Sequence, residues 1–291
     1  MLHQDIAKVR HEQTINCGWT TRALDKEYEY APYDMNMPRK LPIEKPLKCY
    51  DHDTPLTVRG QNLALLCGNG LAVSDLRPHL VYCSPALRCV QTAVLVGESA
   101  GTKNLLIRIE PGRPPLVSID ELCKAGFPID RHYEPQFTVF DSNENNETYN
   151  ARIKTTLLRL VGEQDVDDVQ CGLTDENKFV VLLVGHASTV DMAVGFLERD
   201  DRRATEQDLQ QLAAKIPYCC AVGLTRRGAT TTLSSERRQL LIPTLHVARC
   251  VLLTIFQDRF FSVESLGSFI DDFGTNISDL DICVEFFYIG R

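Results

Sequence analysis

Two histidines and two arginines occupy positions from which they could bind and transfer a phosphoryl group. Arg10 and His11 lie together near the start of the chain, and His186 follows Gly185 at the end of an apolar run. Arg88 lies between them in the sequence. A phosphate monoester carries charged oxygens around its phosphorus, so its transfer needs a nucleophile or base and several fixed positive charges. Imidazole and guanidinium groups supply both, and the sequence therefore predicts a phosphoryl-transfer site.

The elements that would position these residues are strands that alternate with helices. Apolar runs predict strands at Ile6–Val9, Leu80–Cys83, Leu105–Ile109 and Phe179–Val184. Apolar residues at helical spacing predict helices over residues 149–161 and 205–217. This alternation favours an α/β fold with a mostly parallel sheet covered on both faces. The uninterrupted apolar run at 179–184 is typical of a central strand that is buried on both sides.

In such a sheet, the carboxyl ends of the strands form the edge at which ligands usually bind. His11 and His186 each follow a predicted strand, so we expect both at this edge. Ser84-Pro85 favours the start of a helix, because serine caps a helix and proline suits its first position. Arg88 would then lie beside backbone amides that can bind an anion, and the amides around Ser188 could contribute at a second helix. The alternatives are a purely structural histidine at position 11 and a surface ion pair at Arg88.

The composition excludes several other classes of protein. The chain has 291 residues, of which 44% are hydrophobic, enough for one large domain or two small ones. A net charge of -8 and a pI near 5.4 argue against nucleic acid as a partner. The 11 cysteines include no Cys-x-x-Cys pair and predict reduced, mostly buried thiols. With no secretory signal, membrane span or metal-ligand spacing recognised, we expect a cytoplasmic protein without a membrane partner, metal or other cofactor.

The order of three motifs resembles the histidine phosphatase superfamily, also called phosphoglycerate mutase-like. These motifs are Arg10-His11, Ser84-Pro85-Ala86-Leu87-Arg88-Cys89-Val90-Gln91-Thr92 and Gly185-His186-Ala187-Ser188. Within the superfamily, the chain is most similar to the phosphatase domain of the Sts proteins, the suppressors of T-cell receptor signalling. The shared segments are Asn36-Met37-Pro38, residues 53–60, Val81-Tyr82-Cys83-Ser84-Pro85 and Ile216-Pro217-Tyr218. The resemblance covers roughly residues 5 to 228 and is specific only in combination.

The resemblance implies a three-layer sandwich around a mostly parallel sheet, the phosphoglycerate mutase-like fold. It implies that His11 is a nucleophile that forms a phosphohistidine and that His186 holds the phosphoryl group. Arg10, Arg88 and Ser188 would bind the phosphate. The implied substrate is a phosphorylated protein, in particular one with phosphotyrosine, or a small phosphate ester, and Sts-like domains suggest a homodimer.

The chain departs from the family pattern at two places that matter for catalysis. The first family motif typically reads Arg-His-Gly-Glu-Arg, whereas this chain has Arg10-His11-Glu12-Gln13-Thr14 and so lacks the second arginine. After Glu110, proline stands where the Sts branch has its general acid. Such losses typically cost about 10²- to 10⁴-fold for the acid and about 10²-fold for a phosphate donor. Glu12, Glu110 and Glu121 are the candidates for a substitute acid.

These observations predict a histidine phosphatase-like domain at residues 1–228, with an insertion at about 111–147 that flanks the pocket, and a divergent C-terminal tail at 229–291. Two functions remain open. The first is a phosphomonoesterase that works through His11, with weakened activity. The second is a catalytically inactive pseudophosphatase that serves as a phosphate-binding or scaffold module.

Overall fold

The computed structural model describes part of the chain. The described residues are 30–50, 53–110, 117–136, 145, 147–156, 159–160, 179–186, 189, 219–226, 233–235 and 283–289. The predicted strand Ile6–Val9 and the predicted helix at 205–217 lie outside these residues.

A six-stranded sheet forms the centre of the described structure, in the order β2-β1-β3-β6-β4-β5. The strands are β1 (Leu80–Cys83), β2 (Ile107–Ile109), β3 (Phe179–Gly185), β4 (Cys220–Arg226), β5 (Leu233–Ser235) and β6 (Cys283–Ile289). Strand β1 pairs in parallel with both β2 and β3, and β4 pairs in parallel with β6. The β3–β6 and β4–β5 pairs are antiparallel. The predicted α/β fold is confirmed, with parallel pairs in the β2-β1-β3 half and between β4 and β6.

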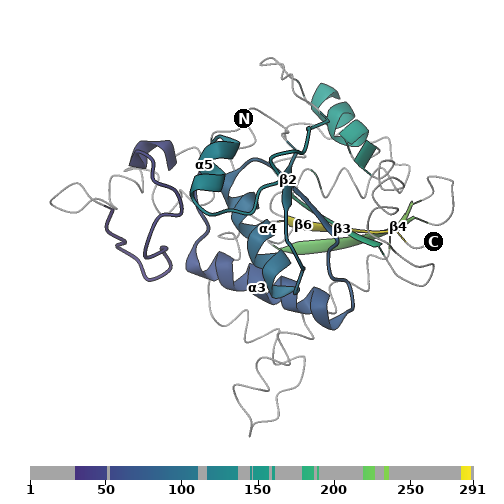
Figure 1. Ribbon diagram of the computed structural model, residues 1–291, viewed down its shortest axis with the longest axis horizontal. Helices are drawn as coiled ribbons and strands as arrows, with labels where there is room; N and C mark the ends of the chain where they lie inside the picture. The colour runs from purple at the N-terminus through teal and green to yellow at the C-terminus, as the bar shows by residue number, and fades with distance from the viewer. Residues whose placement is uncertain are drawn as a thin grey trace, which may run out of the picture.

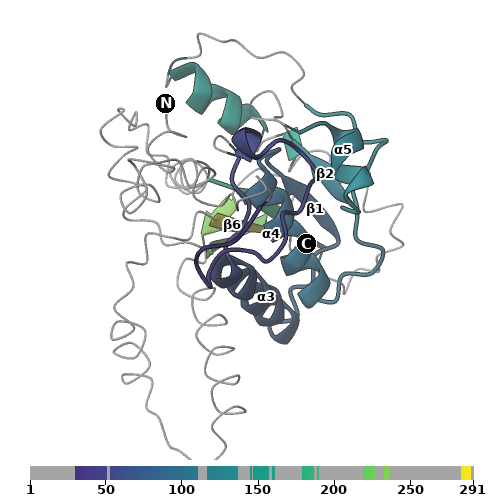
Figure 2. The same ribbon diagram turned by 90° about the vertical axis from the view of Figure 1, so that its left-hand side faces the viewer.

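Two helices that pack on each other cover one face of this sheet, namely α3 (Val58–Val73) and α4 (Leu87–Ser99). Figures 1 and 2 show them side by side, with the helical residues 147–156 and 159–160 away from them. A glycine permits the close approach of α3 to α4: a Cβ at Gly68 would lie 2.0 Å from Ser99 Oγ and 2.3 Å from the Val96 carbonyl oxygen. Two shorter helices are η1 (Leu47–Tyr50) and α5 (Ile119–Lys124).

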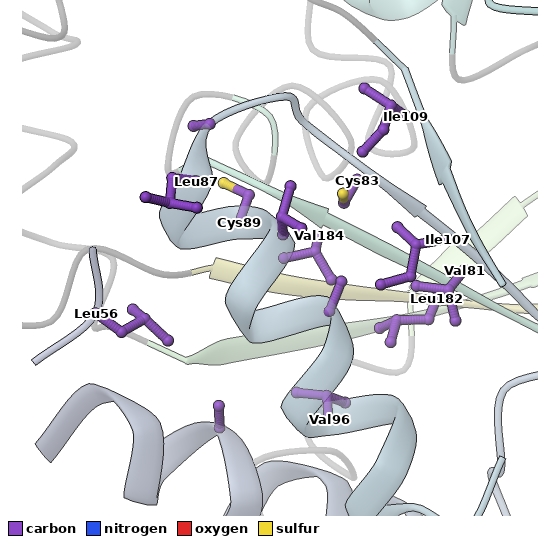
Figure 3. Packing of buried hydrophobic residues seen from close by; sticks show 14 of the residues in the cluster. Leu56, Val81, Cys83, Leu87, Cys89, Val96, Ile107, Ile109, Leu182 and Val184 are labelled. Carbon is purple, nitrogen blue, oxygen red and sulfur yellow. The ribbon is translucent and has the colours of Figure 1, made fainter. Parts of the chain in front are cut away.

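Strand β3 is buried on both faces, as its apolar sequence predicted. Leu182 and Val184 belong to the core cluster that the sheet forms with α3 and α4, whereas Val181 and Leu183 alternate with them and are also buried. Leu87 and Cys89, on the first turn of α4, belong to the same core cluster as Val184, and Figure 3 shows all three. This packing fixes the start of α4 against the end of β3.

Two segments that the sequence marks as divergent contribute to the described structure. The segment 229–291, predicted to be a divergent C-terminal tail, supplies β5 and also β6, which lies between β3 and β4 inside the sheet. A strand bonded on both edges is part of the sheet, so this segment packs on the domain. In the interval 111–147, predicted to be an insertion, Val117, Leu122 and Ile129 belong to the core cluster.

Candidate functional site

The candidate site lies where the neighbouring strands β1 and β3 end. Their register pairs Cys83 with Val184, and the Ser84 backbone N–H donates to the Val184 carbonyl at 3.0 Å. The residues that follow the strands, Ser84 and His186, therefore lie together, and Ser84 Oγ is 2.9 Å from His186 Nε2. The prediction that His186 stands at the carboxyl edge of a parallel pair is confirmed by this geometry.

Arg88 reaches the same place from helix α4. It is the second residue of the helix, is 3% exposed, and its Nη2 lies 3.4 Å from His186 Nδ1. The surface ion pair that was the alternative for this arginine is excluded by its burial. A guanidinium, an imidazole and a hydroxyl thus meet at the end of β3, and this set can bind an anion.

The cap of helix α4 differs from the prediction. Ser84 does not cap it; the N-cap residue is Ala86, which makes no side-chain capping bond. Asp53, a distant and fully buried residue, instead accepts the Leu87 backbone N–H through Oδ1 at 2.8 Å. The sequence marked Asp53 only as part of a segment shared with the family and did not predict its capping role. A cap supplied from 34 residues away leaves no local sequence signal.

A lysine and a tyrosine surround the Asp53 carboxylate. Lys45 Nζ lies 3.5 Å from Asp53 Oδ2 and 4.2 Å from the centre of the Tyr50 ring. The Tyr50 hydroxyl donates to the Ile43 carbonyl and accepts the Ile43 backbone N–H. Burial raises the pKa of Tyr50 to about 12, so its hydroxyl stays neutral at ordinary pH. The Asp53 carboxylate that caps α4 is therefore itself paired with Lys45 inside the protein.

The backbone at His186 is held by residues that sequence reasoning missed. Thr189 N–H donates to the His186 carbonyl at 2.8 Å, and the His186 N–H donates to Thr189 Oγ1 at 3.4 Å. On the other side, Cys89 Sγ donates to the Gly185 carbonyl at 3.7 Å, which ties the first turn of α4 to the end of β3. The short hydroxyl side chain three residues after His186 is typical of such a local turn and was the available signal.

Two of the three candidate acids are engaged elsewhere. Glu110 follows β2, and its carboxylate accepts the Tyr133 hydroxyl at 2.5 Å and the Gln136 backbone N–H at 3.1 Å. Glu121 forms the capping box of α5, and hydrogen bonds from Ser118 lower its pKa, so it is ionised at neutral pH. An ionised carboxylate has no proton to give to a leaving group. These contacts argue against both residues as the substitute acid.

Glu110→Gln is therefore expected to reduce stability rather than acid catalysis. The neutral amide keeps one acceptor but loses the charge-assisted bond from Tyr133, at a cost of about 1–3 kcal/mol. General acids assist poor leaving groups most, by about 10²- to 10⁴-fold. We expect the rate ratio between para-nitrophenyl phosphate and an alkyl phosphate to stay as in the parent protein. The exposed Glu98→Gln is the control, and a selective loss on the alkyl ester would contradict this assignment.

Other predicted site residues lie outside the described part of the chain: Arg10, His11, Glu12 and Ser188. Of the thiols near the site, Cys83 has a pKa raised well above its usual value by burial and, second, by Cys89. It therefore stays protonated and is a poor nucleophile. Among the described residues, no group of three or more metal-ligand side chains could hold a metal ion. None of the described helices is long and apolar enough to cross a membrane.

The chain is similar to several known proteins. Residues 45–112 match the family described as the histidine phosphatase superfamily, branch 1. The human ubiquitin-associated and SH3 domain-containing protein A is 30% identical over 234 residues, which are 74% of this chain and 34% of that protein. The ecdysteroid-phosphate phosphatase of Bombyx mori is 32% identical over 238 residues, 75% of this chain and 34% of that protein.

A solved structure shares the fold. The crystal structure of the ecdysone phosphate phosphatase of Bombyx mori in complex with tungstate aligns with a TM-score of 0.53 and 29% identity, over 66% of this chain and 76% of that one. Sequence and fold together identify the chain as a member of the histidine phosphatase superfamily. It spans about a third of the length of the curated relatives that it matches.

Proposed function

We propose that the protein is a phosphomonoesterase that transfers the phosphoryl group of its substrate to His11 and then to water. The P–O bond to the leaving group breaks as a P–N bond to the imidazole of His11 forms, and water later releases inorganic phosphate and the free histidine. Arg88, with Arg10, would neutralise the phosphate oxygens, and His186 would complete the binding site. We place this activity in the cytoplasm.

The observation that carries this proposal is the meeting of Arg88, His186 and Ser84 at the end of β3. Arg88 is buried, and its guanidinium lies 3.4 Å from the imidazole of His186. Burial costs a guanidinium its hydration free energy, which an anion or other hydrogen-bonding partners must offset. This set is held in place by the ends of β1 and β3 and by the start of α4, which Asp53 caps. The names of the relatives, which include phosphatases, support the same reaction class.

A catalytically inactive phosphate-binding module is the second candidate. The sequence after His11 lacks an arginine found in the family pattern, and Glu110 and Glu121 are engaged in structural hydrogen bonds. A protein of this kind would keep the anion site and lose turnover. Glu12 remains the proposed acid for the active alternative.

The test is hydrolysis of para-nitrophenyl phosphate by the full chain, beside His11→Ala and the exposed control His132→Ala. Calorimetric binding of inorganic phosphate is measured on all three. We expect turnover that His11→Ala abolishes and that His132→Ala retains. Phosphate binding without turnover would favour the inactive module. Turnover that survives His11→Ala would contradict the phosphohistidine, and a wild-type protein without phosphate binding would overturn both functions.

We further propose a phosphorylated protein or a small phosphate ester as the natural substrate. One relative is named for an ecdysteroid phosphate, which is a small phosphate ester. Rates on a phosphotyrosine peptide and on a steroid phosphate, measured at equal concentration with the same preparation, decide between them.

A further inference from the structure

We propose that Ser84 Oγ donates a hydrogen bond to a phosphate oxygen, and that Arg88 sets this donor role by fixing the tautomer of His186. The proposal rests on the proposed phosphate site and adds a residue to it. Neither the helix cap predicted for Ser84 nor the family resemblance gives the hydroxyl this role.

The first step concerns which ring nitrogen of His186 carries hydrogen. A guanidinium has only donors, so across the 3.4 Å contact with Arg88 the Nδ1 atom must accept. A neutral imidazole with Nδ1 as acceptor carries its hydrogen on Nε2. A doubly protonated ring would direct an N–H at the guanidinium, which like charge opposes. Arg88 therefore selects the neutral ring with hydrogen on Nε2.

The second step follows from the contact between His186 and Ser84. With hydrogen on Nε2, the ring donates to Ser84 Oγ across 2.9 Å. A hydroxyl has one hydrogen and two lone pairs, so accepting this bond leaves the hydroxyl hydrogen for another acceptor. The bond from the ring also occupies one lone-pair direction, which limits where that hydrogen can point.

The third step identifies the acceptor by its chemistry. The Ser84 side chain is half-buried, so a ligand can reach it, and its backbone is fixed by the bond to Val184. The guanidinium of Arg88 contacts the same imidazole ring that contacts Ser84. An anion that presents several acceptor oxygens matches both a guanidinium and a hydroxyl donor, and a phosphoryl group does so. The ring of His186 contacts both groups and so holds the Ser84 hydroxyl beside the Arg88 guanidinium.

The tautomer is tested directly on the full chain by nitrogen NMR of ¹⁵N-histidine-labelled protein above pH 8, with the His186 signals assigned by their loss in His186→Gln. We expect protonated Nε2 and unprotonated Nδ1, and loss of this preference in Arg88→Met. Protonated Nδ1 in the wild-type protein would overturn the proposal. This readout needs no ligand and no turnover.

Binding is tested with inorganic phosphate by calorimetry on Ser84→Ala, Ser84→Thr and the control Ser99→Ala. Ser99 lies at the far end of α4, where its hydroxyl donates to the Leu95 carbonyl. Loss of one hydrogen bond to a charged group predicts about tenfold weaker binding in Ser84→Ala, with recovery in threonine and no change in the control. Equal binding by Ser84→Ala and wild type would overturn this proposal alone. A wild-type protein that binds no phosphate would overturn the proposed function as well.

Discussion

Replacing Arg88 by methionine is expected to weaken binding of inorganic phosphate about 100-fold or more. Arg88 is a buried guanidinium at the proposed site, and methionine keeps much of its length and apolar stem while removing the charge and all five donors. Removal of one donor to a developing oxyanion costs about 10²- to 10³-fold in rate, so hydrolysis of para-nitrophenyl phosphate should fall at least as much. Calorimetry and steady-state kinetics measure the two effects.

One variant separates the charge of Arg88 from its shape, and a second serves as the control. Arg88→Lys keeps a positive charge but lacks the planar fork, and we expect an intermediate loss. Arg77→Met is the matched control, because Arg77 is exposed and pairs with exposed Asp75 at 3.4 Å. Its effect on phosphate binding should be negligible. Equal affinities for Arg88→Met and Arg77→Met would show that the end of β3 is not the phosphate site.

The sequence predicted the elements that depend on local pattern. Strand β1 was predicted at its observed bounds, and β3 extends by one residue beyond its predicted end. Strand β2 begins at Ile107, two residues later than predicted. The bounds of these strands are encoded locally, because each strand is an apolar run and a glycine precedes His186. The positions of His186 and Arg88 at one sheet edge followed because parallel strands bring their carboxyl ends together.

The sequence did not predict the contacts that join distant segments. Asp53 caps a helix that begins 34 residues later, and β6 enters the sheet between strands far from it in the chain. The sequence pattern indicated neither the Asp53 cap nor the place of β6 in the sheet. A capping carboxylate or a paired strand can be recognised only once its partner is known. The same limit explains Ser84, whose residue type suits a helix cap but whose hydroxyl contacts His186 instead.

These missed contacts bear on how an acidic chain would build the proposed anion site. The net charge of -8 works against phosphate at long range, and at 0.15 M salt such fields decay within about 8 Å. Within the site, the buried carboxylate of Asp53 is neutralised by Lys45 and turned toward the Leu87 amide. Its charge therefore stabilises the start of α4 rather than opposing an anion at Arg88, one residue further along.

Removing the Asp53 carboxylate should consequently destabilise the fold strongly. In Asp53→Ala the Lys45 ammonium, 9% exposed, loses its carboxylate, and the Leu87 N–H loses its acceptor. Breaking a buried pair on one side typically costs about 3–5 kcal/mol of the free energy of unfolding. Asp53→Asn keeps an oxygen for Leu87 and should cost about 1–3 kcal/mol. Urea unfolding at pH 7 measures both.

A double substitution tests whether the cost arises from the stranded charge. Lys45→Met added to Asp53→Ala removes the uncompensated ammonium, so the double variant should be more stable than Asp53→Ala alone. The control is Asp75→Asn, which breaks an exposed pair with Arg77 and should change stability by about 0.5 kcal/mol or less. If Lys45→Met recovered nothing, the burial of Lys45 would not be the source of the loss, and the helix cap would account for it. If Asp53→Ala were as mild as Asp75→Asn, the carboxylate would not hold α4, and the position of Arg88 would need another cause.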